Sequence, residues 1–470
     1  MTGRRRSLGA ASEARASVRA GAKRLALAPA LLLLASTAPL AAQPQPEGGQ
    51  FQINAYTTSH QSDPSVARTP DGGFVVAWSS YGSFSGGDPV HRNILVRRFG
   101  ADGAPLEQDF QISVQPYTWV GHDEPSVATW ADGNFVVAWH SNFSDASDQS
   151  SFSVQGRRYA ADGSPLTGQF QVNTYTTGPQ ATADVTAAAD GGFVAVWRST
   201  GSAGGDTSGT SIQGARFDEN GEPVGTEFQV NTYTTNNQYS PAIAAEADGG
   251  FVVVWESLGS PGNDSSEWSI QGRRYAADGA PLAAQFQVNT YTTGTQAVPD
   301  VAALADGGFV VVWAGGGSPG VTWTVQGRRY GADGSPLGAP FQISTWNSSH
   351  QSRPAVAAGA DGGFVVVWHS VSGSPGGDLS GYSIQGRRYA ANGSPDGPQF
   401  QVNTYTTNHQ REQAVEVLAD GRFVVAWSSN GATGGDTSGY SVQGQRYAAA
   451  VLFADGFETG DTTGWSMTVP

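Results

Sequence analysis

The sequence predicts an all-β fold, a seven-bladed β-propeller made of four-stranded antiparallel blades. Three observations carry this prediction. A unit of about 58 residues occurs seven times, each unit contains four segments typical of short strands, and the first and last units are out of phase with each other. Such a repeat stacks copies of one supersecondary unit, and the alternative is an open β-solenoid, whose repeats are usually shorter.

Three markers recur in step along the chain. The first, FQVN or a close variant, begins at Phe51, Phe110, Phe170, Phe228, Phe286, Phe341 and Phe400. The second, DGGFVVVW, ends at Trp78, Trp139, Trp197, Trp255, Trp313, Trp368 and Trp427. The third, QGRRY, ends at Phe99, Tyr159, Phe217, Tyr275, Tyr330, Tyr389 and Tyr447.

The fourth unit illustrates the four strands expected in each blade. The sequence predicts strands at residues 241–245, 251–255, 268–276 and 286–292. The second of these is β-branched and aromatic throughout, which is typical of a strand buried on both faces. Asp-Gly turns join the strands at one end of the blade, because glycine adopts positive φ at low cost.

The phase of the markers predicts how the ring closes. The segment 51–56 is a fourth strand without a preceding blade, and the last unit ends its third strand at Tyr447 without an FQVN of its own. The N-terminal strand therefore completes the last blade, which leaves no open sheet edge.

The N-terminus has the order of a secretory signal. A stretch rich in arginine precedes an apolar run that begins at Leu25, and small residues lead to Ala42. A membrane anchor is the alternative, but the apolar run is too short to span a bilayer. We expect a signal peptide at 1–42, a short linker at 43–50, the propeller at 51–449 and a C-terminal tail at 450–470. The mature chain is expected to have no transmembrane segment and to be secreted or at the cell surface.

Charge and cysteine content exclude several function classes. The chain has a formal net charge of −15 at pH 7, which argues against nucleic acid as a partner because phosphates need a basic surface. An acidic surface is compatible with a cationic partner, with divalent metal or with simple solubility. The absence of cysteine excludes cysteine-ligated zinc and thiol catalysis. We expect a monomer.

The strings FVVVW, QGRRYAADGSPLG and FQVNTYTT resemble repeats of secreted or surface bacterial proteins, a calcium-binding or adhesin-like repeat family. The resemblance covers about residues 51–447. It implies an extracellular propeller and brings no family reaction with it.

Residues that recur in every unit are interpreted as scaffold. The second arginine of the QGRRY marker is expected to stack on an aromatic ring or to pair with an acid between blades, and the first arginine to be more exposed. The second arginines are Arg98, Arg158, Arg216, Arg274, Arg329, Arg388 and Arg446.

One aspartate recurs in the long loop after the tryptophan strand. Carboxylate, hydroxyl and carbonyl oxygens of these loops are ligand types suited to calcium, whereas the alternative is a solvated turn. The series consists of Asp88, Asp148, Asp206, Asp264, Asp378 and Asp436. Calcium is the one cofactor that the sequence suggests.

The long loops and the connections from fourth to first strand lie at the same end of every blade, the long-loop face. This face is the expected ligand-binding surface, because units differ most there. Aromatic and histidine side chains among polar residues suit a glycan or a cell-surface protein, and the alternative for each histidine is a solvated loop. The candidates are His60, His122, Trp119, Tyr239, Trp268, Trp346, His350 and His409.

Common enzyme motifs are absent from the sequence, which has no GxSxG, no HExxH and no phosphate loop. The leading hypothesis is therefore an extracellular, non-enzymatic binding or adhesion scaffold. The alternative is an exported glycan-active hydrolase or lyase with acids at the mouth of the central channel. A purely structural surface protein is a third class. Three or more non-repeating acids, histidines or arginines gathered at one point would favour the enzyme.

Overall fold

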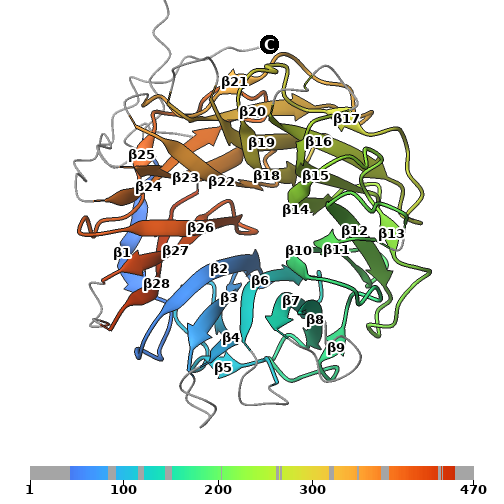
Figure 1. The fold of residues 1–470 in the computed structure, drawn as a ribbon. Helices are drawn as coiled ribbons and strands as arrows, with labels where there is room; N and C mark the ends of the chain where they lie inside the picture. The colour runs from blue at the N-terminus through green and yellow to red at the C-terminus, as the bar shows by residue number, and fades with distance from the viewer. Residues whose placement is uncertain are drawn as a thin grey trace, which may run out of the picture. The chain divides into compact units, whose positions relative to one another are not determined.

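The computed structural model describes residues 43–82, 91–114, 121–142, 151–202, 204–260, 264, 267–316, 322–346, 349–371, 381–431, 436 and 438–449. Seven four-stranded antiparallel sheets surround a central axis within these residues (Figure 1), which confirms the predicted seven-bladed propeller. No helix in this part of the chain is long and apolar enough to cross a membrane.

The first strand of each blade lies nearest the axis and the second strand pairs with it (Figure 1). The first strands are β2 (Gln61–Arg68), β6 (His122–Thr129), β10 (Gln180–Ala187), β14 (Gln238–Ala245), β18 (Gln296–Ala303), β22 (Gln351–Ala358) and β26 (Gln410–Val417). The second strands are β3 (Phe74–Tyr81), β7 (Phe135–Asn142), β11 (Phe193–Thr200), β15 (Phe251–Leu258), β19 (Phe309–Gly315), β23 (Phe364–Val371) and β27 (Phe423–Asn430).

The third and fourth strands form the outer half of each blade. The third strands are β4 (Arg92–Phe99), β8 (Phe152–Tyr159), β12 (Thr210–Phe217), β16 (Trp268–Tyr275), β20 (Thr324–Tyr330), β24 (Tyr382–Tyr389) and β28 (Tyr440–Tyr447). The fourth strands of blades 1 to 6 are β5 (Phe110–Gln111), β9 (Phe170–Gln171), β13 (Phe228–Gln229), β17 (Phe286–Gln287), β21 (Phe341–Gln342) and β25 (Phe400–Gln401).

The fourth strands are shorter than the sequence predicted. In blade 4 the ladder ends at Gln287 instead of Thr292, because the side chain of Asn289 replaces the backbone as hydrogen-bond partner. Its Oδ1 accepts a 2.8 Å hydrogen bond from the backbone N–H of Ile270 in the third strand. The asparagine of the FQVN marker thus ends the strand pairing while it satisfies a buried donor.

The hydrophobic core lies between blades. One apolar cluster fills each junction, and each cluster combines residues of two consecutive blades. The seven marker tryptophans are fully buried in these clusters. Each blade therefore depends on its two neighbours for burial of its sheet faces.

A glycine in the third strand makes room for the aromatic ring of the fourth strand. A Cβ at Gly272 would lie 2.7 Å from Cζ of Phe286, which is closer than van der Waals contact allows. The same close approach occurs between Gly444 and Phe51, also at 2.7 Å. This contact explains why glycine recurs in the QGRRY marker.

Strand β1 (Pro46–Gln52) pairs antiparallel with β28 and closes the ring as the fourth strand of blade 7. It begins five residues earlier than the expected strand, inside the stretch that the sequence suggested as a linker. The backbone N–H of Ile53 donates to Val442 O at 2.8 Å, and the apolar cluster between blades 7 and 1 contains Ile53.

The recurring arginines connect structural elements. The guanidinium of Arg274 pairs with Glu246 at 2.8 Å and lies 5.8 Å from the ring centre of Phe309 in the next blade, as expected of the second arginine. The first arginine is the more exposed of the pair, as expected, since Arg273 is half-buried whereas Arg274 is buried, but it also makes a contact of its own. Nη1 of Arg273 donates to the carbonyl oxygen of Val230 in the preceding blade at 3.0 Å, so this residue also joins two blades.

Candidate functional site: the axial cavity

Each innermost strand carries a β-bulge near its long-loop end. In β2 the register shifts between Ser62 and Ser65, so that two residues face one residue of β3. The first bulged residue has a positive φ in all seven blades although none of the seven is glycine. These residues are Asp63 (54°), Glu124 (51°), Thr182 (54°), Ser240 (49°), Val298 (53°), Arg353 (49°) and Glu412 (55°). We call them the bulge residues.

The backbone of the bulge bonds to the preceding blade. The N–H of Glu124 donates to Oγ of Ser79 at 3.1 Å, and the N–H of Val298 donates to Oε2 of Glu256 at 2.9 Å. At the bulge the backbone N–H loses its hydrogen bond to the neighbouring strand, and the bond to the preceding blade replaces it. It uses no side-chain atom of the bulge residue, so the bulge tolerates different side chains.

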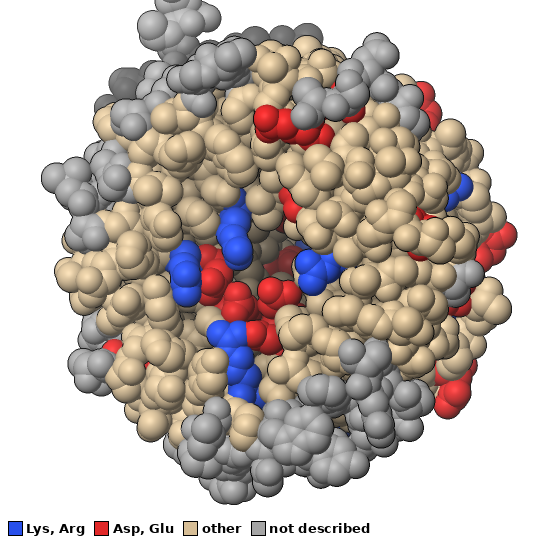
Figure 2. Space-filling view, in the orientation of Figure 1, with Lys and Arg blue, Asp and Glu red and all other residues tan. Residues whose placement is uncertain are grey.

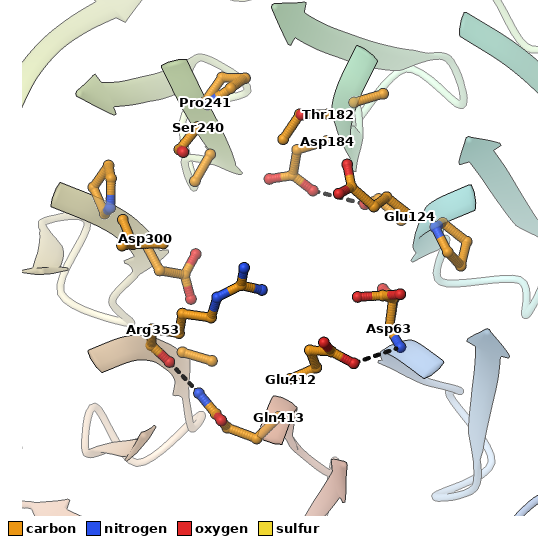
Figure 3. Close-up of a pocket in the computed structure, with 18 of the residues that line it drawn as sticks. Asp63, Glu124, Thr182, Asp184, Ser240, Pro241, Asp300, Arg353, Glu412 and Gln413 are labelled. Carbon is orange, nitrogen blue, oxygen red and sulfur yellow. Dashed lines mark hydrogen bonds between the residues drawn. The ribbon is translucent and has the colours of Figure 1, made fainter. Parts of the chain in front are cut away.

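The bulge residues line a cavity of about 420 Å³ on the axis. Figure 2 shows arginine side chains around this hollow and acidic side chains inside it. Six ionisable residues line the cavity, and they come from six different blades (Figure 3). They are Asp63, Glu124, Asp184, Asp300, Arg353 and Glu412.

Asp63 and Glu412 form a carboxyl pair in the cavity. Glu412 Oε2 lies 3.4 Å from the backbone N of Asp63 and accepts a 2.8 Å hydrogen bond from Oγ of Ser428. Nε of Arg411 lies 3.2 Å from the other oxygen of Glu412. Burial, followed by the negative charge of Glu412, raises the pKa of Asp63 to about 6. The pair thus combines a carboxyl group with a raised pKa and a second carboxyl group beside a guanidinium.

Asp184 and Asp300 lie two residues after the bulge residues of their strands. Asp184 bridges two blades, because it accepts hydrogen bonds from Oγ of Ser126 at 2.6 Å and from the N–H of Ile243 at 2.9 Å. Asp300 accepts from the N–H of Val356 at 2.8 Å. Burial raises the pKa of Asp184 and raises that of Asp300 to about 7. Both carboxyls therefore serve chiefly as blade connectors at the cavity wall.

Arg353 is the cation of the cavity lining. Its side chain is exposed and points into the cavity (Figure 3). Among the described residues its guanidinium has no ion pair or hydrogen bond, although its carbonyl oxygen accepts from Nε2 of Gln413. A guanidinium in this state is available to an acceptor group of a ligand.

Glu124 contacts a histidine of the second strand. Its Oε2 lies 3.5 Å from Nδ1 of the buried His140. Burial lowers the pKa of His140, while the charge of Glu124 opposes this effect. His369 holds the equivalent position in blade 6, where burial lowers its pKa to about 4.

Five of the residues predicted from the sequence lie in aromatic contacts on the long-loop face. Tyr239 and Trp268 stack on each other with ring centres 5.2 Å apart. The remaining three are exposed histidines, each beside an aromatic ring. They are His60 with Tyr440 at 5.8 Å, His350 with Trp323 at 6.4 Å and His409 with Tyr382 at 4.7 Å.

The other predicted ligand residues do not join these contacts. His122 begins β6 and is fully buried, and its Nδ1 accepts a hydrogen bond from Nε1 of Trp139 at 3.2 Å. It occupies the position of the glutamine that begins every other innermost strand, and burial leaves it no surface for a ligand. Trp346 is half-buried, and Trp119 lies outside the described residues.

The aspartate series suggested for calcium is buried where the structure describes it. Asp206, Asp264 and Asp436 each accept a hydrogen bond from the side-chain amide of the FQVN asparagine, at 3.1 Å for Asp206 and 3.2 Å for the other two. They are therefore not solvated turn residues. The described residues contain no group of three or more metal-ligating side chains. Asp88, Asp148 and Asp378 lie outside them, and calcium at these loops stays a prediction.

The residues of the axial cavity were not among those predicted, although a signal for them exists. Aligned on the first residue of each innermost strand, the third position varies between acid, arginine, hydroxyl and valine, whereas proline follows it in five of the seven blades. A position that varies inside a regular repeat is the place at which single blades differ in chemistry. This variation was visible in the sequence without any knowledge of the bulge.

The fold and the site together define a seven-bladed propeller with an acid-rich cavity on its axis. No family model matches the chain and no curated protein matches it, so the resemblance to the calcium-binding or adhesin-like repeat family stays a prediction.

Solved structures similar to this chain include a protein of unknown function from Dyadobacter fermentans, which is 14% identical with a TM-score of 0.48 over 85% of this chain and 98% of that chain. The polysaccharide lyase Uly1 is 11% identical, with a TM-score of 0.49 over 88% and 99%. An α-L-arabinanase of Penicillium chrysogenum is 14% identical, with a TM-score of 0.46 over 84% and 98%. At these values the likeness carries no argument about activity.

Proposed function

We propose that this protein is an exported glycan-active hydrolase whose working site is the axial cavity. The observation that carries the proposal is the convergence of Asp63 and Glu412, two non-repeating carboxyl groups of different character, in one solvent-accessible cavity. Export rests on the basic and apolar order of residues 1–42. The gathering of six ionisable residues that the repeat does not impose favours an enzyme over a passive scaffold.

The two carboxyl groups suit acid–base hydrolysis of a glycosidic bond. The protonated carboxyl of Asp63 donates its proton to the glycosidic oxygen as the bond from this oxygen to the anomeric carbon breaks. The carboxylate of Glu412 accepts a proton from the water that adds to the anomeric carbon. A carboxyl whose pKa is about 6 remains protonated in mildly acidic solution, as a general acid requires.

Non-enzymatic glycan binding is the second candidate. The aromatic contacts on the long-loop face favour it, because aromatic rings at a surface offer apolar contact area with little loss of conformational freedom. Binding of this kind would use the same face and would not require the carboxyl pair to transfer protons.

The test uses the purified protein and the variants Asp63→Asn and Glu412→Gln. Each is incubated with a panel of polysaccharides between pH 4 and pH 8, and new reducing ends and unsaturated ends are measured. We expect reducing ends without unsaturation, and activity that falls as pH rises above about 6, because Asp63 then loses its proton. Each variant is expected to lower kcat by about 10²- to 10⁴-fold.

Asp278→Asn is the matched control. Asp278 lies in an exposed turn, and asparagine occupies the same position of blade 6 as Asn392. This variant should keep full activity. Unsaturated products would show that the protein is a lyase and would refute the proposed hydrolase. Binding without cleavage of any polysaccharide in the panel would support the non-enzymatic binding function instead.

A further inference from the structure

We propose that Tyr239 and Trp268 of blade 4 form a platform on which a pyranose ring of a glycan chain stacks while a neighbouring sugar occupies the axial cavity. The inference rests on the glycan-binding part of the proposed function and does not depend on cleavage. The inference means that the ligand is an oligosaccharide that extends beyond the cavity, and not a single sugar.

The platform begins one residue away from the cavity lining along the chain. Tyr239 is the second residue of β14, and the next residue along the chain, Ser240, is the bulge residue that lines the cavity. Trp268 is the first residue of β16, the third strand, which lies farther from the axis. The two residues therefore lie at the long-loop end of blade 4, one on the innermost strand beside the cavity lining and one on a strand farther out.

The two rings are held in a fixed arrangement. Their centres are 5.2 Å apart with an interplanar angle of 25°, and the guanidinium of Arg198 in blade 3 lies 5.1 Å from the centre of the Tyr239 ring. Both aromatic side chains are half-buried. A preorganised aromatic surface loses little entropy when the apolar C–H face of a sugar packs on it.

The platform is specific to blade 4. The residues equivalent to Tyr239 in the other blades are Ser62, Asp123, Ala181, Ala297, Ser352 and Arg411. Aromatic residues begin the third strand in several blades, but in blade 4 alone an aromatic residue also precedes the bulge residue. A contact needed to pack the blades together would recur in every blade. The restriction of this aromatic pair to blade 4 therefore indicates a role in ligand binding.

The experiment measures how affinity depends on chain length. Cello-, chito-, xylo- and galacturono-oligosaccharides from the disaccharide to the hexasaccharide are titrated against the full-length protein, and dissociation constants are obtained by calorimetry. For a series that binds, the wild type is expected to gain affinity with each added sugar until the platform is occupied. Trp268→Ala should weaken the hexasaccharide about tenfold and leave the disaccharide unchanged.

Two further variants control for indirect effects. Trp268→Phe keeps an aromatic surface and should retain most of the gain with chain length, whereas Trp323→Ala removes a tryptophan of blade 5 whose ring partner is His350 and should have no effect on it. Circular dichroism melting shows whether each variant is folded.

Equal loss of affinity for short and long oligosaccharides in Trp268→Ala would overturn the platform, as would unchanged affinity for both or no binding by any of the four series. Length-dependent binding without hydrolysis would refute the proposed enzyme alone. Hydrolysis with an unaltered length dependence in Trp268→Ala would refute the platform alone.

Discussion

Residues that depart from the repeat fall into two groups, those that are buried and those that line the solvent-accessible cavity. His122 departs from the glutamine that begins the other innermost strands, but it is fully buried and accepts a hydrogen bond from a tryptophan N–H. Its counterpart Gln351 accepts from Nε1 of Trp368 at 2.8 Å. Asp63 and Arg353 depart from the repeat inside a solvent-accessible cavity, where no common structural role replaces their own chemistry.

We expect His122→Gln to make the protein less sensitive to acid. Burial lowers the pKa of His122 to about 3 from its ordinary value of 6.5. Between pH 6.5 and pH 3 the imidazole is therefore protonated in the unfolded chain and neutral in the folded protein. The free energy of unfolding decreases as pH falls below 6.5, by about 2 kcal/mol at pH 5. Melting temperatures of wild type and variant should diverge between pH 7 and pH 5, whereas His409→Gln, at an exposed site, should follow the wild type. Parallel curves would contradict the assignment.

The β-bulge is the element that creates the site. Side chains of a regular strand alternate between two faces, and the extra residue of the bulge changes the direction of one side chain. Its positive φ costs free energy for every residue except glycine, and the cost is highest for a β-branched residue. Val298 has such a backbone, with φ of 53°, and carries no group that the proposed chemistry uses.

We expect Val298→Asn to stabilise the protein by about 1 kcal/mol, because asparagine tolerates the left-handed region that valine disfavours. The hydrogen bond from this backbone N–H to Glu256 stays available to the variant. The midpoint of urea unfolding should rise. Thr182→Asn, at the equivalent residue of blade 3 with φ of 54°, should show a gain of the same sign. A lower midpoint in both variants would mean that the bulge is not strained.

At the scale of the whole molecule, the repeat determined most of the fold. The count of markers predicted seven blades, and the offset between Phe51 and Tyr447 predicted closure by the N-terminal strand. The extent of β1 and the short fourth strands were not predicted, because they depend on side chains such as Asn289 that end the backbone pairing. The sequence suggested acids at the mouth of the central channel, but the residues that line the axial cavity were missed for a similar reason. The left-handed backbone at Asp63 is imposed by contacts with the preceding blade, and a single strand sequence does not reveal it.

We expect Gly444→Ala to weaken ring closure. The added Cβ would lie 2.7 Å from Cζ of Phe51, so β1 must shift away from β28 at a cost of about 1 to 3 kcal/mol. Amide hydrogens of β1 and β28 should exchange faster, and proteases should cleave near Pro46 earlier than in the wild type.

Gly272→Ala makes the same steric change in blade 4, where residues 276–285 connect the third and fourth strands along the chain. This control should lower the melting temperature without exposing the N-terminal segment. Equal protection of β1 in both variants would contradict its role as the closing strand.

The backbone bonds of the bulge also bear on how such a protein changes through evolution. Duplication of one blade supplies seven copies of a position that faces the axis. At Asp63, Glu124 and Val298 the bond to the preceding blade uses only the backbone N–H group. A substitution of a bulge residue alters the chemistry of the cavity, whereas the hydrogen bonds between strands and the apolar contacts between blades stay the same. New activities can therefore arise at the axis one codon at a time, with little risk to folding, and a ring of repeats acquires an individual site without losing its symmetry elsewhere.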